Sequence, residues 1–145
     1  MKAIFGFVAL LVSGACTLHG EDAPATDKSI RALVRNSTLI IDADIVQPNL
    51  YGSVDEFIAS YSVIVRVRNT FLGQAPAPEL WVRVAGLPLD FRSQPTLLKT
   101  RQRCLFFLRP DQNGSTGFLG VASFASAQRY HPELISAVQR LTGSK

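Results

Sequence analysis

Hydrophobic and polar residues alternate along the chain with the two-residue period of strands that bury one face. Residues 38–46 place one apolar face on every second position: Leu39, Ile41, Ala43 and Ile45. In residues 57–73 one face holds Tyr61, Val63, Val65 and Val67, and the other holds Ser62, Ile64, Arg66 and Arg68. Residues 79–86 direct Leu80, Val82 and Val84 inward and Trp81 and Arg83 outward. These patterns predict three strands, and the apolar runs 103–110 and 118–125 predict two more.

Two segments show helical spacing instead. Ile30, Leu33 and Val34 predict a helix of about two turns that begins near Asp27 and ends near Asn36. A second helix is predicted for residues 129–143, where Pro132 suits the first helical position and Gly143 suits the end. Leu134, Val138 and Leu141 form its apolar stripe.

The order of these elements predicts a mainly β domain over residues 27–145. Five antiparallel strands close most readily into a barrel, because closure removes exposed sheet edges. We therefore expect a small five-stranded OB-like barrel with a short helix before it and a C-terminal helix after it. The alternative is a flat meander with a helix packed on one face. Pro48 and Asn49 are expected to end the first strand, and residues 87–102 are expected to form a long irregular connection.

The first residues have the layout of a secretory signal peptide. Lys2 precedes an apolar run, and small residues Ser13 and Ala15 stand where a signal peptidase requires them. The run is too short for a transmembrane helix, which needs roughly 20 apolar residues. We predict a signal peptide over 1–15 and a polar tether over 16–26, with an uncleaved anchor as the alternative. Export then places the protein in the periplasm or at the cell surface.

Cys16 follows the predicted signal peptide directly, and three outcomes are open for it. It becomes the lipidated first residue of a membrane-anchored lipoprotein, or it is the N-terminal residue with a thiol that is free or paired with Cys104, or later cleavage removes it. The string 13–16 resembles a lipobox, with Ser13 at the place where the family prefers Leu. Cys104 lies in the apolar run 103–110, where a cysteine is usually a small buried residue.

The charge of the chain points away from nucleic acid. Without residues 1–15 the chain has 14 basic and 11 acidic residues, a net charge of +3, and its basic residues are dispersed. A nucleic-acid footprint requires basic clustering. Lys99, Arg101 and Arg103 share one side of a strand, and we expect them to form a solvated face, with a contact to anionic lipid or polysaccharide as the alternative.

No sequence motif indicates catalysis, a metal or another cofactor. Nucleophile motifs are absent, and the glycines of residues 114–120 join two strands and therefore form no phosphate loop. His19 and His131 are too few for a zinc site. Asp42 and Asp44 point the same way from one strand, and we expect a solvent-facing ladder of ion pairs with Arg66 and Arg68. The alternative is a small hydrolase that uses the two carboxylates.

The strand pattern of residues 37–124, with Phe71-Leu72-Gly73 as an aromatic–x–Gly corner, resembles the OB-fold netrin-module domain of tissue inhibitors of metalloproteinases and of bacterial exported proteins. The resemblance implies a protease inhibitor whose N-terminal cysteine binds the zinc of its target, a role that would fall to Cys16. The family begins with Cys-x-Cys, whereas here Thr17 and Leu18 follow the cysteine.

The composition of one strand face favours a binding function. An outward Trp81 beside Arg83 is typical of a protein-interaction hot spot, and OB barrels bind ligands over their middle strands. The candidate binding surface is Trp81, Arg83, Arg66 and Arg68. We therefore predict an exported, lipid-anchored, non-catalytic module that binds a protein or glycan partner. The alternative for Trp81 is burial under the 87–102 connection or the C-terminal helix.

Overall fold

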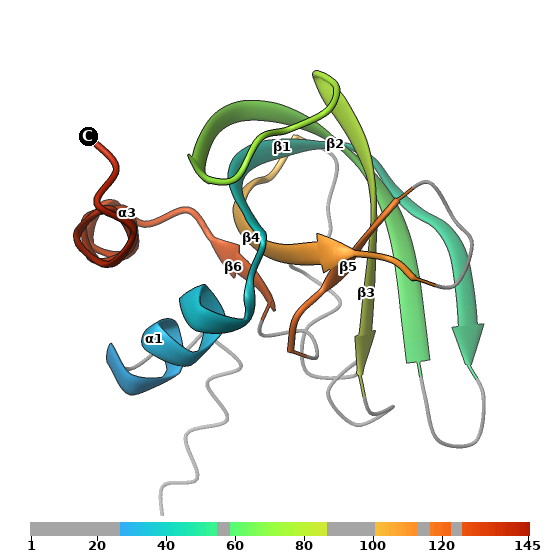
Figure 1. Ribbon diagram of the computed structural model, residues 1–145. Helices are drawn as coiled ribbons and strands as arrows, with labels where there is room; N and C mark the ends of the chain where they lie inside the picture. Colours follow the sequence, from blue (N-terminus) through green and yellow to red (C-terminus); the bar gives the residue numbers. More distant parts are fainter. Residues whose placement is uncertain (1–26, 55–58, 87–100, 113–116, 123–125) are drawn as a thin grey trace, which may run out of the picture.

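The computed structural model describes residues 27–54, 59–86, 101–112, 117–122 and 126–145. The predicted signal peptide, tether, Cys16 and His19 lie outside these residues, as does most of the 87–102 connection. Figure 1 shows a β-barrel with helices on one side. The helices are α1 (Asp27–Asn36) and α3 (Pro132–Thr142). The strands are β1 (Leu39–Val54), β2 (Ala59–Leu72), β3 (Glu79–Gly86), β4 (Arg103–Pro110), β5 (Phe118–Gly120) and β6 (Ala127–Arg129).

The sheet closes on itself, so the flat meander is wrong. Neighbours follow the order β1-β2-β3-β5-β4-β6, and an additional β1–β4 pairing joins the ends of a five-stranded barrel. The predicted OB-like barrel with its two helices is confirmed. The prediction that all five strands run antiparallel is wrong, because β3 and β5 pair in parallel. Strand β6, which pairs with β4, was not predicted.

Strand β1 continues eight residues beyond its predicted end. Its pairing with β2 shifts register between Gln47 and Tyr51, around Pro48 and Asn49, and then resumes to Val54. Proline cannot donate a ladder hydrogen bond, and a bulge accommodates it without ending the strand. The two residues therefore mark an irregularity where the sequence predicted a break.

The barrel interior contains the predicted inward faces. Its buried cluster unites alternating residues from the long strands with the middle of β4. The members are Leu39, Ile41, Ala43, Ile45, Val63, Val65, Leu80, Val82, Val84, Cys104, Phe106, Leu108 and Ala127. Cys104 is fully buried among them, as expected of a small apolar residue. The side chain of Tyr61 lies outside the described residues.

A second apolar cluster joins the helices to the outside of the barrel. Ile40 of β1 and Phe107 of β4 point outward into it and are fully buried. Ile30 and Leu33 of α1, and Leu134 and Val138 of α3, complete the contact. The helices therefore cover the β1–β4 side of the barrel and leave the outer faces of β2 and β3 on the other side (Figure 1).

Two glycines share a left-handed backbone conformation but differ in the space around them, so together they test the packing at the end of β2. Gly73 (φ 75°) follows β2, and an added Cβ would collide with the Thr38 carbonyl, whereas the space around Gly143 (φ 68°) is open. Gly143→Ala is expected to lower the free energy of unfolding by about 1–2 kcal/mol through backbone strain alone. Gly73→Ala adds a clash worth roughly 1–3 kcal/mol more. Urea denaturation measures both, and equal losses would contradict the close approach of Gly73 to Thr38.

Candidate functional site

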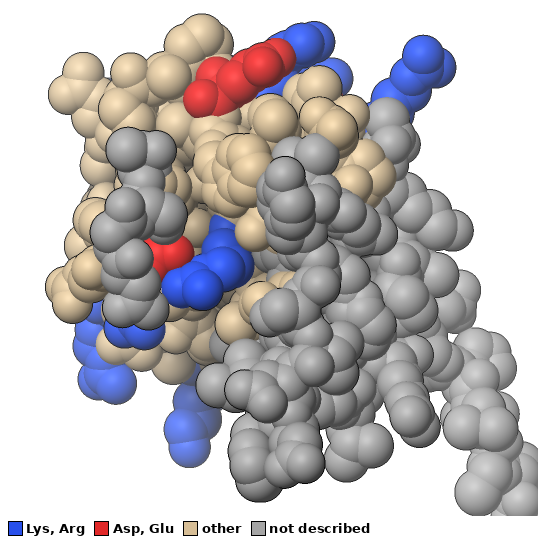
Figure 2. All heavy atoms as spheres, turned by 90° about the vertical axis from the view of Figure 1, so that its right-hand side faces the viewer, with Lys and Arg blue, Asp and Glu red and all other residues tan. Residues whose placement is uncertain are grey.

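Strands β2 and β3 bring the four predicted surface residues onto one outer face. Ile64 is the register partner of Trp81, Ser62 that of Arg83, and Arg66 that of Glu79. We call this surface the β2–β3 face, and it consists of Ser62, Ile64, Arg66, Arg68, Glu79, Trp81 and Arg83. Figure 2 views this side of the molecule, where acidic and basic side chains lie next to one another.

Every arginine of the β2–β3 face is paired with a carboxylate. Arg66 Nη2 lies 2.8 Å from Glu79 Oε1, and Arg68 Nε lies 2.6 Å from Asp44 Oδ2. The Arg68–Asp44 pair confirms one rung of the predicted ladder. The other rung is wrong, since Arg66 pairs with Glu79 across β2 and β3. The face therefore has arginine side chains but little net positive charge to attract a polyanion.

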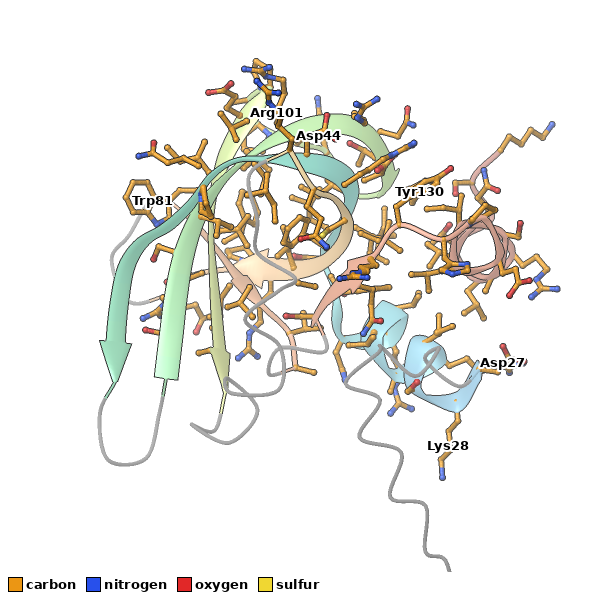
Figure 3. All side chains as sticks on the ribbon, turned by 180° about the vertical axis from the view of Figure 1, so that it is seen from behind. Asp27, Lys28, Asp44, Trp81, Arg101 and Tyr130 are labelled. Carbon is orange, nitrogen blue, oxygen red and sulfur yellow. The ribbon has the colours of Figure 1, made fainter. Side chains whose placement is uncertain are left out.

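Trp81 is the exposed aromatic side chain of this face. Its exposed fraction is 41%. Among the described residues, Leu141 is the one other large apolar residue that is exposed to solvent. The C-terminal helix therefore does not cover Trp81, whereas the 87–102 connection, the other predicted cover, lies mostly outside the described residues. Gly117 allows the neighbouring segment to approach, since a Cβ there would lie 2.9 Å from the Trp81 carbonyl oxygen and 3.3 Å from Cδ1. Figure 3 shows the indole pointing away from the barrel.

Arg83 lies beside Trp81 and is held by an aspartate that sequence reasoning did not identify. Its Nη2 is 2.9 Å from Oδ2 of Asp111, whose side chain is 4% exposed. The Arg83 Nε is the one buried side-chain nitrogen or oxygen without a hydrogen-bond partner among the described residues. A buried donor without a partner requires an explanation in a native structure. Arg83 is therefore the side chain of this face that has a hydrogen-bond donor, Nε, without a partner in the described part of the chain.

Asp42 does not face solvent, which corrects the prediction for the carboxylate pair. Its side chain is buried, and it accepts hydrogen bonds from Arg103 Nε at 2.8 Å and Nη2 at 2.5 Å. Asn69 Nδ2 lies 3.5 Å from Oδ2. The Arg103 guanidinium also lies 3.6 Å above the centre of the Tyr130 ring. Arg103, assigned from sequence to a solvated face, is instead the partner of a buried carboxylate, whereas Arg101 is exposed.

This arrangement does not support acid–base chemistry by Asp42 and Asp44. Both oxygens of Asp42 face Arg103, and Asp44 holds Arg68. The hydrogen bond to Asp42 raises the pKa of the Arg103 guanidinium above its ordinary value, so Arg103 stays a cation and does not release a proton near neutral pH. A catalytic carboxylate must reach its substrate, and Asp42 has no exposed surface. Asp42 and Arg103 therefore form a buried structural pair.

The described residues contain no group of three or more His, Cys, Asp and Glu side chains arranged to hold a metal ion. His131 takes the N-cap position of α3, and its side chain makes no capping hydrogen bond. None of the helices in the described ranges has the length and apolarity to cross a bilayer. No protein-family model matches the chain, and no curated protein matches it.

Proposed function

We propose that this protein is an exported, non-catalytic binding module, held at the membrane through a lipidated Cys16, which binds a protein or glycan partner with its β2–β3 face. The observation that carries the proposal is the exposure of Trp81 at the middle of that face. Exposed tryptophan and arginine are enriched among the residues that dominate binding energy. The layout of residues 1–16 supports export and anchoring.

The paired arginines narrow the contact that we propose. Ion pairs already satisfy Arg66 and Arg68, so a partner gains little from their charge. The indole offers a broad apolar surface, and the Arg83 guanidinium beside it, one third exposed, is held by Asp111 so that its remaining donors keep a fixed orientation. Stacking on Trp81, oriented by Arg83, is therefore the proposed mode of recognition for an uncharged protein or sugar surface.

Photo-crosslinking in cells that export the protein tests this surface. A benzoylphenylalanine at position 79, two residues from Trp81 on β3, is expected to give a defined adduct with the partner. The same group at exposed position 32 on α1 is the matched control and is expected to give none. Adducts of equal yield at both positions, or at neither, would overturn the proposal.

The adduct at position 79 is expected to fall at least tenfold in the variant Trp81→Ala. Removing an aromatic anchor at the centre of an interface costs about 2 kcal/mol or more of binding free energy, and 1.4 kcal/mol is a factor of ten. Leu141→Ala removes the other exposed large apolar side chain, on α3, and is expected to leave the yield unchanged. Thermal unfolding of both variants checks that the fold is intact.

The closed barrel also supports a narrower second proposal, that the protein resembles netrin-module protease inhibitors and acts through an unmodified N-terminal Cys16. Mass spectrometry of the mature N-terminus separates the two proposals. A diacylglyceryl group on the Cys16 sulfur supports the anchored binding module, because the inhibitor proposal requires an unmodified Cys16. A mature N-terminal Cys16 whose thiol and α-amino group are both unmodified supports the inhibitor instead. Pairing with Cys104 would require the N-terminal segment to enter the barrel core, where Cys104 is buried.

A further inference from the structure

Beyond its first residue, Asp27, the charged side chains of α1 are all basic and exposed. Lys28, Arg31 and Arg35 are spaced by three and four residues, which places them along one side of the helix. Ile30 and Leu33 occupy the opposite side and are buried against the barrel. The three cations are exposed, and none forms an ion pair within the described residues. They are therefore not held in ion pairs in this part of the chain, in contrast to the arginines of the β2–β3 face, and Asp27, one turn before Arg31, is the one carboxylate of the helix.

A pocket of about 400 Å³ continues this basic surface between α1 and α3. Its lining consists of Asp27, Arg31, Ala137, Arg140 and Leu141. Leu141, which is 38% exposed, lines the pocket together with two guanidinium groups and the Asp27 carboxylate. Helices that lie in a membrane interface combine exposed apolar residues with basic ones in this way. Together α1 and α3 contain four cations and two carboxylates, a net charge of +2.

We propose that the layer formed by α1 and α3 is a membrane-docking face that binds the headgroups of anionic phospholipids. Arg31 and Arg140 would hold a headgroup phosphate at the pocket, Lys28 and Arg35 would add attraction along α1, and Leu141 would enter the headgroup region. Arginine suits this role because its guanidinium matches the geometry of phosphate oxygens.

The position of the proposed anchor agrees with this docking. Ten residues separate Cys16 from Asp27, a linker that spans at most about 35 Å when fully extended. A lipid on Cys16 would therefore keep α1 close to the bilayer. Figure 3 shows Trp81 on the opposite side of the barrel from Asp27 and Lys28. Docking of the helix layer would direct the β2–β3 face away from the membrane, toward a partner. This last step rests on the proposed function, whereas docking itself does not.

Vesicle binding tests the docking face without the lipid anchor. The protein would be residues 16–145 with Cys16→Ser, which contains every described residue, and the probes would be phosphatidylcholine vesicles with and without phosphatidylglycerol. Binding is expected only with phosphatidylglycerol, and it should weaken as salt shortens the range of the attraction, to about 10 Å at 0.1 M ionic strength. Equal binding to both vesicles, or to neither, would overturn the inference.

Charge variants assign that binding to the helix layer. Arg31→Gln and Arg140→Gln are each expected to weaken it about fivefold, and the double variant about 25-fold, since each cation near an anionic surface contributes about 1 kcal/mol. Arg101→Gln removes the same charge from an exposed position far from α1 (Figure 3) and is the matched control. An equal loss in this control would show that net charge alone drives binding, and would contradict a specific face.

The fluorescence of Trp81, the single tryptophan of the chain, reports how the bound protein is oriented on the vesicle. Lipids that carry a spin label in the headgroup quench an indole that lies beside them. Trp81 fluorescence is expected to be unaffected when the protein binds labelled phosphatidylglycerol vesicles, and strong quenching would overturn the proposed orientation. Absence of a lipid on Cys16 in mass spectrometry would remove the anchor from the proposed function and leave the vesicle result unchanged.

Discussion

Arg103→Leu is expected to lower the free energy of unfolding by about 3–5 kcal/mol, the cost of leaving a buried charge without its partner. Arg103 donates two hydrogen bonds to the buried Asp42 carboxylate. Leucine offers no donor there, so the carboxylate would either stay charged away from water or take up a proton. The variant also loses the stacking on Tyr130, which connects β6 to α3. Urea denaturation measures the effect through the midpoint at unchanged slope.

The exposed pair of the same chemistry is the control. Arg66 and Glu79 are 62% and 46% exposed, so Arg66→Leu is expected to cost no more than about 1 kcal/mol. Replacing Asp42 and Arg103 together by leucine should recover most of the loss, because apolar pairs often replace buried ion pairs without a net cost. If Arg103→Leu and Arg66→Leu cost the same, Asp42 is not buried in solution.

The period of two residues was sufficient to predict the inward faces of the barrel. Val63 and Val65, and Val82 and Val84, are buried where alternation placed them, since a strand in a closed barrel has no other way to hide its apolar side. Alternation also directed Trp81 outward and brought the four surface residues onto one face, while burial of Trp81 stayed open as the alternative. Local pattern therefore predicted both the fold class and the composition of the candidate surface.

The alternation of residues along the chain did not predict contacts between strands that are distant in sequence. Asp42 alternates correctly to the outer face of β1, but there the side chain of Arg103, whose register partner on β1 is Asp44, bonds it, and Tyr130 lies against that guanidinium. The local pattern does not distinguish Asp42 from Asp44, which also stands between two inward residues but is partly exposed. Arg103 of β4, which pairs with Asp42, lies 61 residues away in sequence. Parallel pairing of β3 with β5 and the three residues of β6 likewise depend on contacts that periodicity does not encode.

The two sides of the barrel differ in whether their cations form ion pairs, and this difference separates their proposed roles. On the β2–β3 face each arginine has a carboxylate partner, which leaves the indole as its most available binding group. On the helix layer the cations of α1 have no such partner within the described residues. A partner that recognises shape would suit the β2–β3 face, and an anionic surface would suit the helix layer.

Phe106→Ala is expected to lower the free energy of unfolding by about 3–5 kcal/mol, because it leaves a cavity in the barrel core that its neighbours cannot fill. Phe106 is fully buried beside Ile41 and Val65. Phe107→Ala, at the next residue of β4, removes the same ring from the cluster under the helices. A similar loss at both sites, in one transition, would show that the helix layer unfolds together with the barrel.

Arg68→Ala provides the opposite extreme, since its exposed ion pair with Asp44 is expected to contribute less than about 1 kcal/mol. A larger loss for Arg68→Ala than for Phe106→Ala would mean that the strand faces are reversed. A loss confined to Phe106→Ala would mean that α1 and α3 are only loosely attached in solution. In that case the membrane-docking face and the barrel would be separate units, and lipid binding by the helices would no longer orient Trp81.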